Sequence, residues 1–310
     1  MPGNNVYISV DGGGTKTEFC VHNIYGQTDK FFTYGSTNYK TVGVSEAKEN
    51  LVNAFTEICK NEGLEPSQIK GVVLGLSGYD SDTDIQVFNE MAASLGIVQE
   101  KLFLCNDCEL AFRATASPPG ICTVAGTGSI AFGFEENGTA TRCGGWGGLL
   151  SDDGSGYWIA SNVLRRLLKH CDGMDTYEPV FDLIRKFYGG KNLQEMTFIL
   201  TQLNITDIAA SAKLIMDFAG RGDSYCSSVV HKAAELVSQL TLSLSDKIGI
   251  LDRSDASYVI SGGLFRDKTF YGHYKACLEE RLGRELKLLH IKDCTSQNGI
   301  HLAKRLFAGE

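Results

Sequence analysis

The chain has 310 residues and a formal net charge of −8 at neutral pH. Hydrophobic residues make up 43% and charged residues 21% of the chain, which is ordinary for a globular enzyme and allows one large domain or two lobes. The sequence contains no run of Lys and Arg, so we expect neither nucleic acid nor an anionic membrane as a partner.

The amino-terminal segment from Met1 to Asn5 is polar and shows no targeting peptide, and no apolar run is long enough to span a bilayer. We therefore expect a cytoplasmic protein whose ten cysteines are reduced and mostly act as small core residues. The CxxC spacing of Cys105 and Cys108 lacks a second pair, so we assign it no redox or zinc role. The six histidines show no ligand spacing and are expected on the surface or in helix caps.

The first third of the chain alternates short apolar strands with amphipathic helices. We expect strands at 6–10, 18–24, 31–34, 71–76 and 102–105 and helices around 44–58 and 85–95, with a third helix after Asp107. The Pro-Pro pair in Ser117-Pro118-Pro119-Gly120 marks the best boundary. We therefore predict an amino-terminal lobe of residues 1–117 and a carboxy-terminal lobe of residues 118–310.

The second lobe repeats the pattern of the first, with extra helices inserted. Strands are expected at 121–125, from Ile130, at 258–260 and at 287–291, and the longest helix at about 228–251. A last helix at about 296–308 is expected to pack back on the amino-terminal lobe. Mixed strands and helices of this kind indicate an α/β fold with ligands beyond the carboxyl ends of the strands.

A glycine-rich turn, Asp11-Gly12-Gly13-Gly14-Thr15-Lys16-Thr17, follows the first strand. Its glycines let backbone N–H groups approach an anion, Thr15 adds a hydroxyl and Lys16 adds charge. Asp11 can hold Mg²⁺ through water, because this cation prefers oxygen ligands and keeps its waters. The alternative is a plain hairpin turn that only needs positive φ. We favour a phosphate site, and hence ATP as the ligand.

Two further turns have the same character. Gly126-Thr127-Gly128-Ser129 follows the first strand of the second lobe, and the two paired turns are expected to grip the β- and γ-phosphates from both sides. Ser261-Gly262-Gly263 ends a late strand, where adenine or ribose could lie against exposed backbone. Each of these is also compatible with an ordinary turn.

Asp107 is the candidate general base, because it ends an apolar strand and precedes a helix; the alternative is a helix N-cap. The segment Cys143-Gly144-Gly145-Trp146-Gly147-Gly148 indicates backbone packed closely against a ligand. Downstream of it, Asp152 is expected to bind polar ligand groups, and Asp153 is expected to cap the helix that starts near Tyr157.

Together these residues resemble the sugar kinase/Hsp70/actin superfamily and, more narrowly, the N-acetylglucosamine kinase family, which is grouped with BadF/BadG-type ATPases. The motifs that carry the resemblance are Asp11-Gly12-Gly13-Gly14-Thr15, Ser36-Thr37-Asn38, Leu76-Ser77-Gly78, Asp107, Gly126-Thr127-Gly128-Ser129 and the segment from Cys143 to Trp158. The resemblance implies two RNase H-like (actin-like ATPase) lobes with a cleft between them that closes on the substrate.

The resemblance also implies a role for each site residue. An amino sugar is expected to contact Asn38, Gly78, Asp107, Gly145, Trp146 and Asp152. ATP is expected to contact Gly13, Gly14, Thr15, Lys16, Gly126, Thr127, Gly128, Gly262 and Gly263, with Mg²⁺ near Asp11. Asp107 would take the proton from the C6 hydroxyl of the sugar.

The implied enzyme is an ATP-dependent kinase of N-acetylglucosamine, with N-acetylmuramic acid and glucosamine as further candidate substrates and a homodimer as one option for its assembly. Two positions depart from the family pattern, and the first of them bears on the exact sugar. Ile130 stands where related animal kinases have a polar Asn, and a nucleotide-contacting glycine aligns ambiguously within 218–221. The alternatives are an activator ATPase of a benzoyl-CoA reductase or dehydratase system and a sugar-sensing regulator without catalysis.

Overall fold

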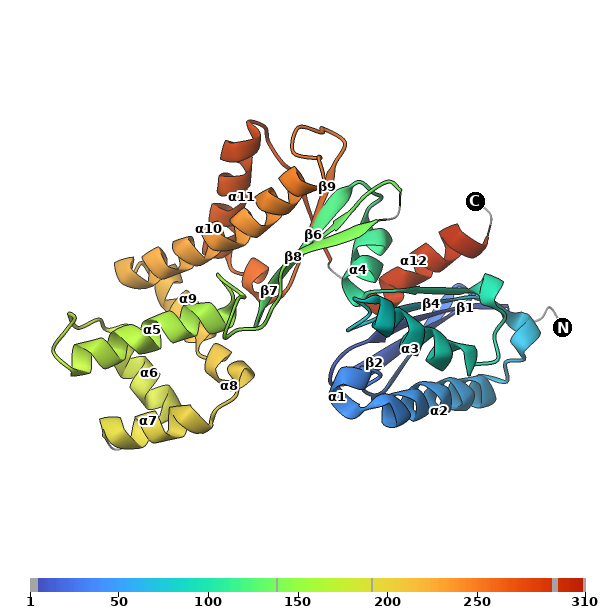
Figure 1. Ribbon diagram of the computed structural model, residues 1–310, viewed down its shortest axis with the longest axis horizontal. Helices are drawn as coiled ribbons and strands as arrows, with labels where there is room; N and C mark the ends of the chain where they lie inside the picture. Colours follow the sequence, from blue (N-terminus) through green and yellow to red (C-terminus); the bar gives the residue numbers. More distant parts are fainter. Residues whose placement is uncertain (1–4, 138, 191, 292–294, 309–310) are drawn as a thin grey trace. The chain divides into compact units, whose positions relative to one another are not determined.

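The structure, a computed structural model, describes residues 5–137, 139–190, 192–291 and 295–308 (Figure 1). Residues 1–4, which make up most of the polar segment from Met1 to Asn5, lie outside the described residues. The chain divides into two compact units. Unit 1 comprises residues 1–117 and 291–310, and unit 2 comprises residues 118–290.

Unit 1 is built on a five-stranded mixed sheet with the order β3-β2-β1-β4-β5. The first three strands form an antiparallel meander, and β4 and β5 run parallel to β1. The strands are β1 (Val6–Gly12), β2 (Lys16–Asn23), β3 (Thr28–Gly35), β4 (Ile69–Leu76) and β5 (Leu102–Cys105).

Helices cover both faces of this sheet, because alternate residues of β1 belong to different cores. Val6, Ile8 and Val10 pack in the larger cluster with side chains of α2 and α3, and Tyr7 packs in a second cluster with side chains of α4 and α12. The helices are α1 (Tyr39–Val42), α2 (Val44–Glu62), α3 (Asp82–Ala93), α4 (Asp107–Thr115) and α12 (Thr295–Phe307), with short 3₁₀ turns at Pro66–Gln68 and Gln99–Lys101.

The last helix, α12, belongs to unit 1 although it ends the chain, and in Figure 1 it lies beside α4. Small residues permit its close approach: a Cβ on Gly299 would lie 1.9 Å from Ser9 Oγ, and a Cβ on Gly71 would lie 2.0 Å from the Phe307 ring. Residues 291–310 are therefore grouped with unit 1, while the rest of the second half, through His290, forms unit 2.

Unit 2 repeats the same sheet, with the order β10-β9-β6-β7-β8. Again the first three strands are antiparallel neighbours, and β9 and β10 are parallel additions beside β6. The strands are β6 (Gly120–Ala125), β7 (Ser129–Phe134), β8 (Ala140–Gly144), β9 (Ser257–Ser261) and β10 (Leu288–His290).

The helices of unit 2 include a long insertion between β8 and β9 (Figure 1). The core of unit 2 joins Ile121 of the sheet to Val237 of α10 and Tyr274 of α11, with further residues of the inserted helices. The helices are α5 (Gly156–Cys171), α6 (Val180–Tyr188), α7 (Leu193–Gln202), α8 (Ile205–Ala209), α9 (Ala212–Gly220), α10 (Ser224–Lys247) and α11 (Lys268–Leu282), with a 3₁₀ turn at Gly263–Arg266.

The predicted fold class, α/β with two RNase H-like sheets, is confirmed. Within the described ranges, no helix is both long and apolar enough to cross a membrane. Two smaller expectations are wrong. His22 is buried in β2, where its Nδ1 lies 2.6 Å from Asp29, and the N-cap of α5 is Ser155 rather than Asp153, because the Ser155 hydroxyl accepts the Trp158 N–H.

Candidate functional site

In unit 1, the glycine turn closes the β1–β2 hairpin. Gly12 must be glycine because a Cβ there would lie 2.4 Å from Thr37 Oγ1. The turn is held by Gly13 N–H donating to the Lys16 carbonyl and by the Ser36 hydroxyl donating to the Gly13 carbonyl, both at 2.9 Å. None of residues 12–14 has a positive φ, so the alternative of a hairpin that merely needs that conformation is wrong.

Three other predicted residues of unit 1 follow the carboxyl ends of its strands: Asn38, Gly78 and Asp107. Asn38 caps α1 by accepting the Lys40 N–H at 3.0 Å, and its amide faces Gly78, where a Cβ would lie 3.3 Å from Asn38 Oδ1. Gly78 follows β4, whose end is tied to β1 by Ser77 N–H donating to the Gly12 carbonyl at 2.8 Å. The structure thus brings Asn38 and Gly78 together.

Asp107 is the first residue of α4 and not its cap. The N-cap is Asn106, whose side chain accepts the Cys108 N–H at 2.8 Å. The same N–H lies 2.9 Å from Asp107 Oδ1. The N-cap alternative for Asp107 is therefore wrong, and its partly buried carboxylate lies at the carboxyl end of β5.

Burial raises the pKa of Asp107 above the usual aspartate value, and the negative charge of Asp80 raises it further. Hydrogen bonds from Cys108 and Ser77 to the carboxylate act in the opposite direction without cancelling the rise. A carboxylate with a raised pKa is a stronger base than an exposed one, which is the property that a general base needs.

A polar network beside Asp107 was not predicted from the sequence. Asp80 accepts the Asn106 side-chain amide at 2.9 Å and lies 3.8 Å from Lys40 Nζ. Lys40 also pairs with the buried Asp84 at 2.9 Å. Burial alone would raise the pKa of Asp84, but hydrogen bonds from Tyr39, Lys40 and Ser81 hold it well below the usual range. Tyr39 and Lys40 follow the capping residue Asn38, so this network fixes the segment around a predicted site residue.

In unit 2, the Gly126–Ser129 turn closes the β6–β7 hairpin and is joined to the start of α5. Gly126 N–H donates to the Gly128 carbonyl at 2.9 Å. The first N–H groups of the helix donate back to the turn, Gly156 to the Gly126 carbonyl at 2.7 Å and Tyr157 to the Thr127 carbonyl at 3.1 Å. Any movement of α5 is therefore transmitted to the turn.

Asp152 lies against the same turn in a strained position. Its φ is +61°, and a Cβ on Gly128 would lie 2.6 Å from its Oδ2. Its side chain is 92% buried, and its Oδ1 has no hydrogen-bond partner among the described residues. Burial raises its pKa, a hydrogen bond from the Gly147 backbone N–H acts in the opposite direction, and the charge of Asp153 raises it further. A buried carboxylate oxygen without a donor, in a non-glycine residue with positive φ, is typical of a ligand site.

The glycine-rich segment after β8 also bends sharply. Gly144, Gly145 and Gly147 all have positive φ, and the Gly145 N–H donates to the Ser129 carbonyl at 3.1 Å. Gly145 and Asp152 are thus both joined to the Gly126–Ser129 turn. The Trp146 ring is 65% exposed and stacks with the Arg142 guanidinium at 3.8 Å.

A cavity of about 780 Å³ opens beside the turn, and all of its lining residues belong to unit 2. Three predicted nucleotide residues, Gly126, Thr127 and Gly263, contribute to its wall. Gly262 lies just behind it, with φ of +104° and no room for a Cβ beside the Ala125 carbonyl. The volume of the cavity suits a nucleotide or another ligand of that size.

Sequence reasoning missed the helical wall of this cavity. It is formed by Gly156, Thr206, Ala209, Ala210, Ala212, Lys213, Met216, Asp217, Leu264, Arg266 and Asp267. Its cations, Lys213 and Arg266, are balanced in formal charge by Asp217 and Asp267. Only the ambiguous glycine expected within 218–221 pointed near these residues, since α9 contains both Asp217 and Gly220.

The predicted magnesium residue, Asp11, lies at the end of β1 and pairs in register with Glu18 of β2. A carboxylate beside a glycine turn supplies the oxygen donors that Mg²⁺ prefers, with the remaining positions left to water and phosphate. Among the described residues, no group of three or more His, Cys, Asp or Glu could hold a metal ion, so Asp11 stays a prediction, with most ligands of the ion left to water and phosphate.

Two sheets of one strand order, each with a glycine turn after its first strand, define the actin-like ATPase class of folds. The family model described as the BadF/BadG/BcrA/BcrD ATPase family matches residues 8–293, and the chain belongs to this family.

Two relatives support a narrower comparison. The N-acetylmuramic acid/N-acetylglucosamine kinase of Clostridium acetobutylicum is 24% identical over 303 residues, which are 96% of this chain and 97% of that protein. The N-acetyl-D-glucosamine kinase of Dictyostelium discoideum is 26% identical over 83% of this chain and 85% of its own length.

Solved structures agree on the fold. A protein from Chromobacterium violaceum has a TM-score of 0.73 at 22% identity, over 96% of this chain and 99% of its own. A ROK family glucokinase from Streptomyces griseus, solved in complex with glucose and AMPPNP, has a TM-score of 0.55 at 15% identity, over 99% and 100%. At these identities the likeness shows the fold alone.

Proposed function

We propose that this chain is an ATP-dependent kinase that transfers the γ-phosphate to the C6 hydroxyl of an amino sugar. N-Acetylglucosamine is the first candidate, and N-acetylmuramic acid and glucosamine belong to the same class. The carrying observation is Asp107, a carboxylate with a raised pKa that follows a strand of the RNase H-like sheet. Membership of an ATPase family and the names of the two relatives support the same reaction.

The nucleotide is assigned to the cavity of unit 2. Gly126, Thr127 and Gly263 line it, and we assign the phosphates to Lys213 and Arg266, which share the lining with Asp217 and Asp267. In unit 1, we assign phosphate contacts to Gly13, Gly14, Thr15 and Lys16. The Lys16 side chain is 66% exposed, and its ammonium lies 3.8 Å from Glu18, a pair that a bound phosphate would compete with.

The acceptor sugar is assigned to Asn38, Gly78, Asp107, Gly145, Trp146 and Asp152. Asp152 has the strongest independent support, because its buried Oδ1 lacks a donor that a sugar hydroxyl would supply. Asn38 and Gly78 lie next to one another in unit 1, and Gly145 lies on the turn that Asp152 contacts.

The chemistry follows from these assignments. The sugar oxygen forms a bond to the γ-phosphorus, the bond from that phosphorus to the β,γ-bridging oxygen breaks, and ADP leaves. The Asp107 carboxylate accepts the hydroxyl proton. Backbone N–H groups of the glycine turns stabilise the spreading negative charge on the phosphoryl oxygens. Mg²⁺ near Asp11, when bound, supplies further neutralisation of that charge.

The test is ADP release with ATP across glucose, glucosamine, N-acetylglucosamine, N-acetylmuramic acid and N-acetylmannosamine. We expect an amino sugar to stimulate release strongly, while 6-deoxy-N-acetylglucosamine, which lacks the acceptor hydroxyl, gives none. Release that no sugar stimulates would contradict the proposal. If protein purified without oxygen also contained iron, the activator ATPase would replace the sugar kinase as the proposed function.

A further inference from the structure

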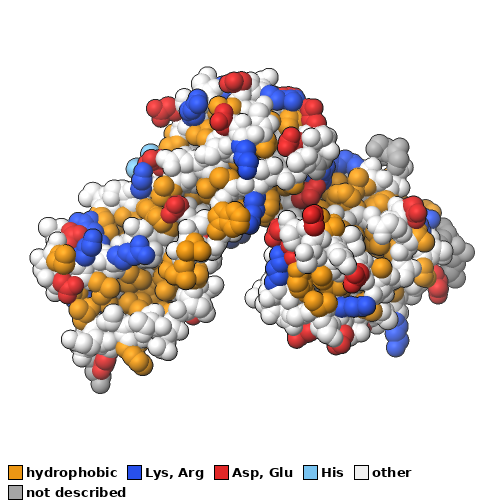
Figure 2. Space-filling model, in the orientation of Figure 1, with side chains coloured by type: hydrophobic (Ala, Val, Ile, Leu, Met, Phe, Trp, Pro, Cys, Tyr) orange, Lys and Arg blue, Asp and Glu red, His pale blue; other side chains and the backbone are white. Residues whose placement is uncertain are grey.

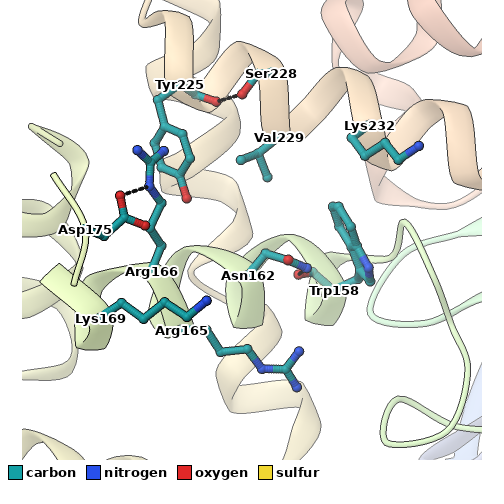
Figure 3. A pocket seen from close by; sticks show the side chains of 10 residues that line it. All are labelled: Trp158, Asn162, Arg165, Arg166, Lys169, Asp175, Tyr225, Ser228, Val229 and Lys232. Carbon is teal, nitrogen blue, oxygen red and sulfur yellow. Dashed lines mark hydrogen bonds and ion pairs between the residues drawn. The ribbon is translucent and has the colours of Figure 1, made fainter. Parts of the chain in front are cut away.

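A second cavity in unit 2, of about 570 Å³, shares no lining residue with the nucleotide cavity (Figure 3). Its walls come from α5 and α10 and from the segment after α5. Figure 2 shows several Lys and Arg side chains close together on the face of unit 2 that carries α5. This is unexpected in a chain whose net charge is −8.

Two of the cations in this second cavity form no direct ion pair among the described residues, although the charge of Lys169 acts on Asp175 in the same lining. Arg165 and Lys169 lie one helical turn apart on α5, are exposed, and form no hydrogen bond or ion pair within the part of the chain that the structure describes. Like charges at this spacing repel one another across the helix surface. An anion bound between them would remove that repulsion, so the pair is better suited to a ligand than to an empty surface.

The remaining residues hold the cavity in shape. Arg166 is fully engaged: it pairs with Asp175 at 3.1 Å and Glu178 at 2.9 Å, and its guanidinium lies 4.1 Å from the centre of the Tyr225 ring. These contacts tie α5 to the start of α10. Figure 3 shows Arg166 against Tyr225 and Asp175, while Arg165 and Lys169 extend separately from α5. The cavity is therefore preorganised, with its free charge on one wall.

The uncharged part of the lining indicates what the anion carries. Trp158 presents an aromatic surface, on which the apolar face of a sugar ring can stack. The Asn162 amide donates to the Trp158 carbonyl at 2.8 Å, which leaves its Oδ1 to accept a hydrogen bond from a hydroxyl. Opposite, Lys232 of α10 adds a cation that is paired only with the exposed Glu235.

Occupancy of this cavity would affect the Gly126–Ser129 turn. The helix that carries Trp158, Arg165 and Lys169 is the one whose first N–H groups donate to the Gly126 and Thr127 carbonyls. A ligand that shifts or stiffens α5 therefore acts on the turn without touching it.

We propose that this cavity is a second ligand site, which binds a phosphorylated monosaccharide and couples its occupancy through α5 to the Gly126–Ser129 turn. The phosphate binds Arg165 and Lys169, and the ring stacks on Trp158. The site itself stands independently of the proposed kinase activity, whereas the coupling rests on the proposed nucleotide binding.

The test uses fluorescence, because the chain has only two tryptophans. In the Trp146→Phe variant, Trp158 is the sole reporter. We expect a saturable change on titration with N-acetylglucosamine 6-phosphate or glucosamine 6-phosphate, and about tenfold or greater weakening when Arg165→Gln and Lys169→Gln are added. The matched control, Lys247→Gln with Arg281→Gln, removes two exposed cations elsewhere in unit 2 and should bind as before.

Three outcomes would overturn the site: no saturable signal, equal weakening in the control pair, or equal binding of inorganic phosphate or AMP, which would remove the sugar from the assignment. The coupling is measured as the affinity for a non-hydrolysable ATP analogue with and without the sugar phosphate. We expect a change of about fivefold or more that the Arg165→Gln, Lys169→Gln variant loses. An unchanged affinity, or an analogue that does not bind, would overturn the coupling while the Trp158 signal still decides the site.

Discussion

The two units use the same sheet for different chemistry. In unit 1, carboxylate side chains stand at the carboxyl ends of two strands: Asp11 in the last residues of β1, before its glycine turn, and Asp107 directly after Asn106 at the end of β5. In unit 2, the turn after β6 (the counterpart of β1) and the end of β9 (the counterpart of β4) present backbone, at Gly126–Ser129 and at Gly262 and Gly263. A side chain can accept a proton, whereas bare backbone can approach a phosphate, so the comparison assigns the base to unit 1 and the nucleotide to unit 2.

The units also differ in what joins the third strand to the fourth. Unit 1 needs only α1 and α2 between β3 and β4, whereas unit 2 inserts α5 through α10 between β8 and β9. The nucleotide cavity and the second cavity both have walls from this insertion. The common sheet supplies the turns, and the inserted helices supply the room for ligands.

The largest effect is expected at the proposed base. Asp107→Asn keeps the shape of the side chain and removes its ability to take a proton, so kcat should fall by roughly 10²–10⁴-fold. The unfolding midpoint and the affinity for an ATP analogue should change little. Steady-state ADP release with N-acetylglucosamine measures kcat. Calorimetry measures the unfolding midpoint and the affinity for the ATP analogue.

The matched control for this variant is Asp82→Asn. Asp82 is the first residue of α3, as Asp107 is of α4, and it is exposed. The Asp82→Asn variant removes the same charge from the same helix position. It should retain normal turnover, because no proton-transfer role is assigned to Asp82. Comparable losses in both variants would show that the effect comes from the helix and not from proton transfer.

A smaller effect is expected on the backbone side of the comparison. In Gly262→Ala, the new Cβ would lie 2.2 Å from the Ala125 carbonyl oxygen, so the end of β9 must move. We expect weaker binding of the ATP analogue and a free energy of unfolding lower by about 1–3 kcal/mol. Gly222→Ala is the control, since its φ of +93° is similar but nothing lies within 4 Å of the new Cβ. Equal effects in the two variants would mean that strain in φ, not the contact with Ala125, is responsible.

The polar network of unit 1 should affect stability more than catalysis. Asp84→Asn removes a buried charge that accepts hydrogen bonds from Tyr39, Lys40 and Ser81, and we expect a loss of about 1–2 kcal/mol in chemical denaturation. Because the folded pKa of Asp84 is lowered, this stabilisation is present above its usual pKa of 3.8 and is lost as the pH falls below it. The difference between wild type and variant should therefore shrink in acid; a constant difference would contradict the ionic origin.

The smallest effect concerns the pH dependence of turnover. Asp107 must be deprotonated to act as a base, so kcat/KM should decline in acid from a higher pH than a normal aspartate would give. Asp80→Asn removes a neighbouring negative charge, lowers the pKa of Asp107 and should move this decline to lower pH. The shift is small because Lys40 already lies 3.8 Å from Asp80. A shift to higher pH would contradict the assignment.

Much of the fold was predictable because its elements are locally encoded. The apolar run at 102–105 matches β5, and the periodic stretch at 228–251 overlaps α10. The glycine turns were visible as composition, but the close approach of Gly12 to Thr37 was not.

The rest depends on contacts between residues that are distant in sequence. Lys213 and Arg266 line one cavity with Gly126, and Arg165 lines another with Lys232, but nothing in their local sequence distinguishes them from surface cations. The pKa of Asp107 depends on burial and on Asp80, which lies in another segment. Such features follow from tertiary packing, so a pattern of spacing does not reveal them.

The most direct test of the central claim, that Asp107 activates a sugar hydroxyl for phosphoryl transfer, is identification of the product by phosphorus NMR after incubation with ATP and N-acetylglucosamine. We predict a phosphate monoester whose phosphorus couples to the two C6 protons, formed by the wild type and, at equal protein concentration, at least about a hundredfold more slowly by Asp107→Asn. Release of inorganic phosphate without any phosphorylated sugar, or the same ester formed at the same rate by both proteins, would contradict the account.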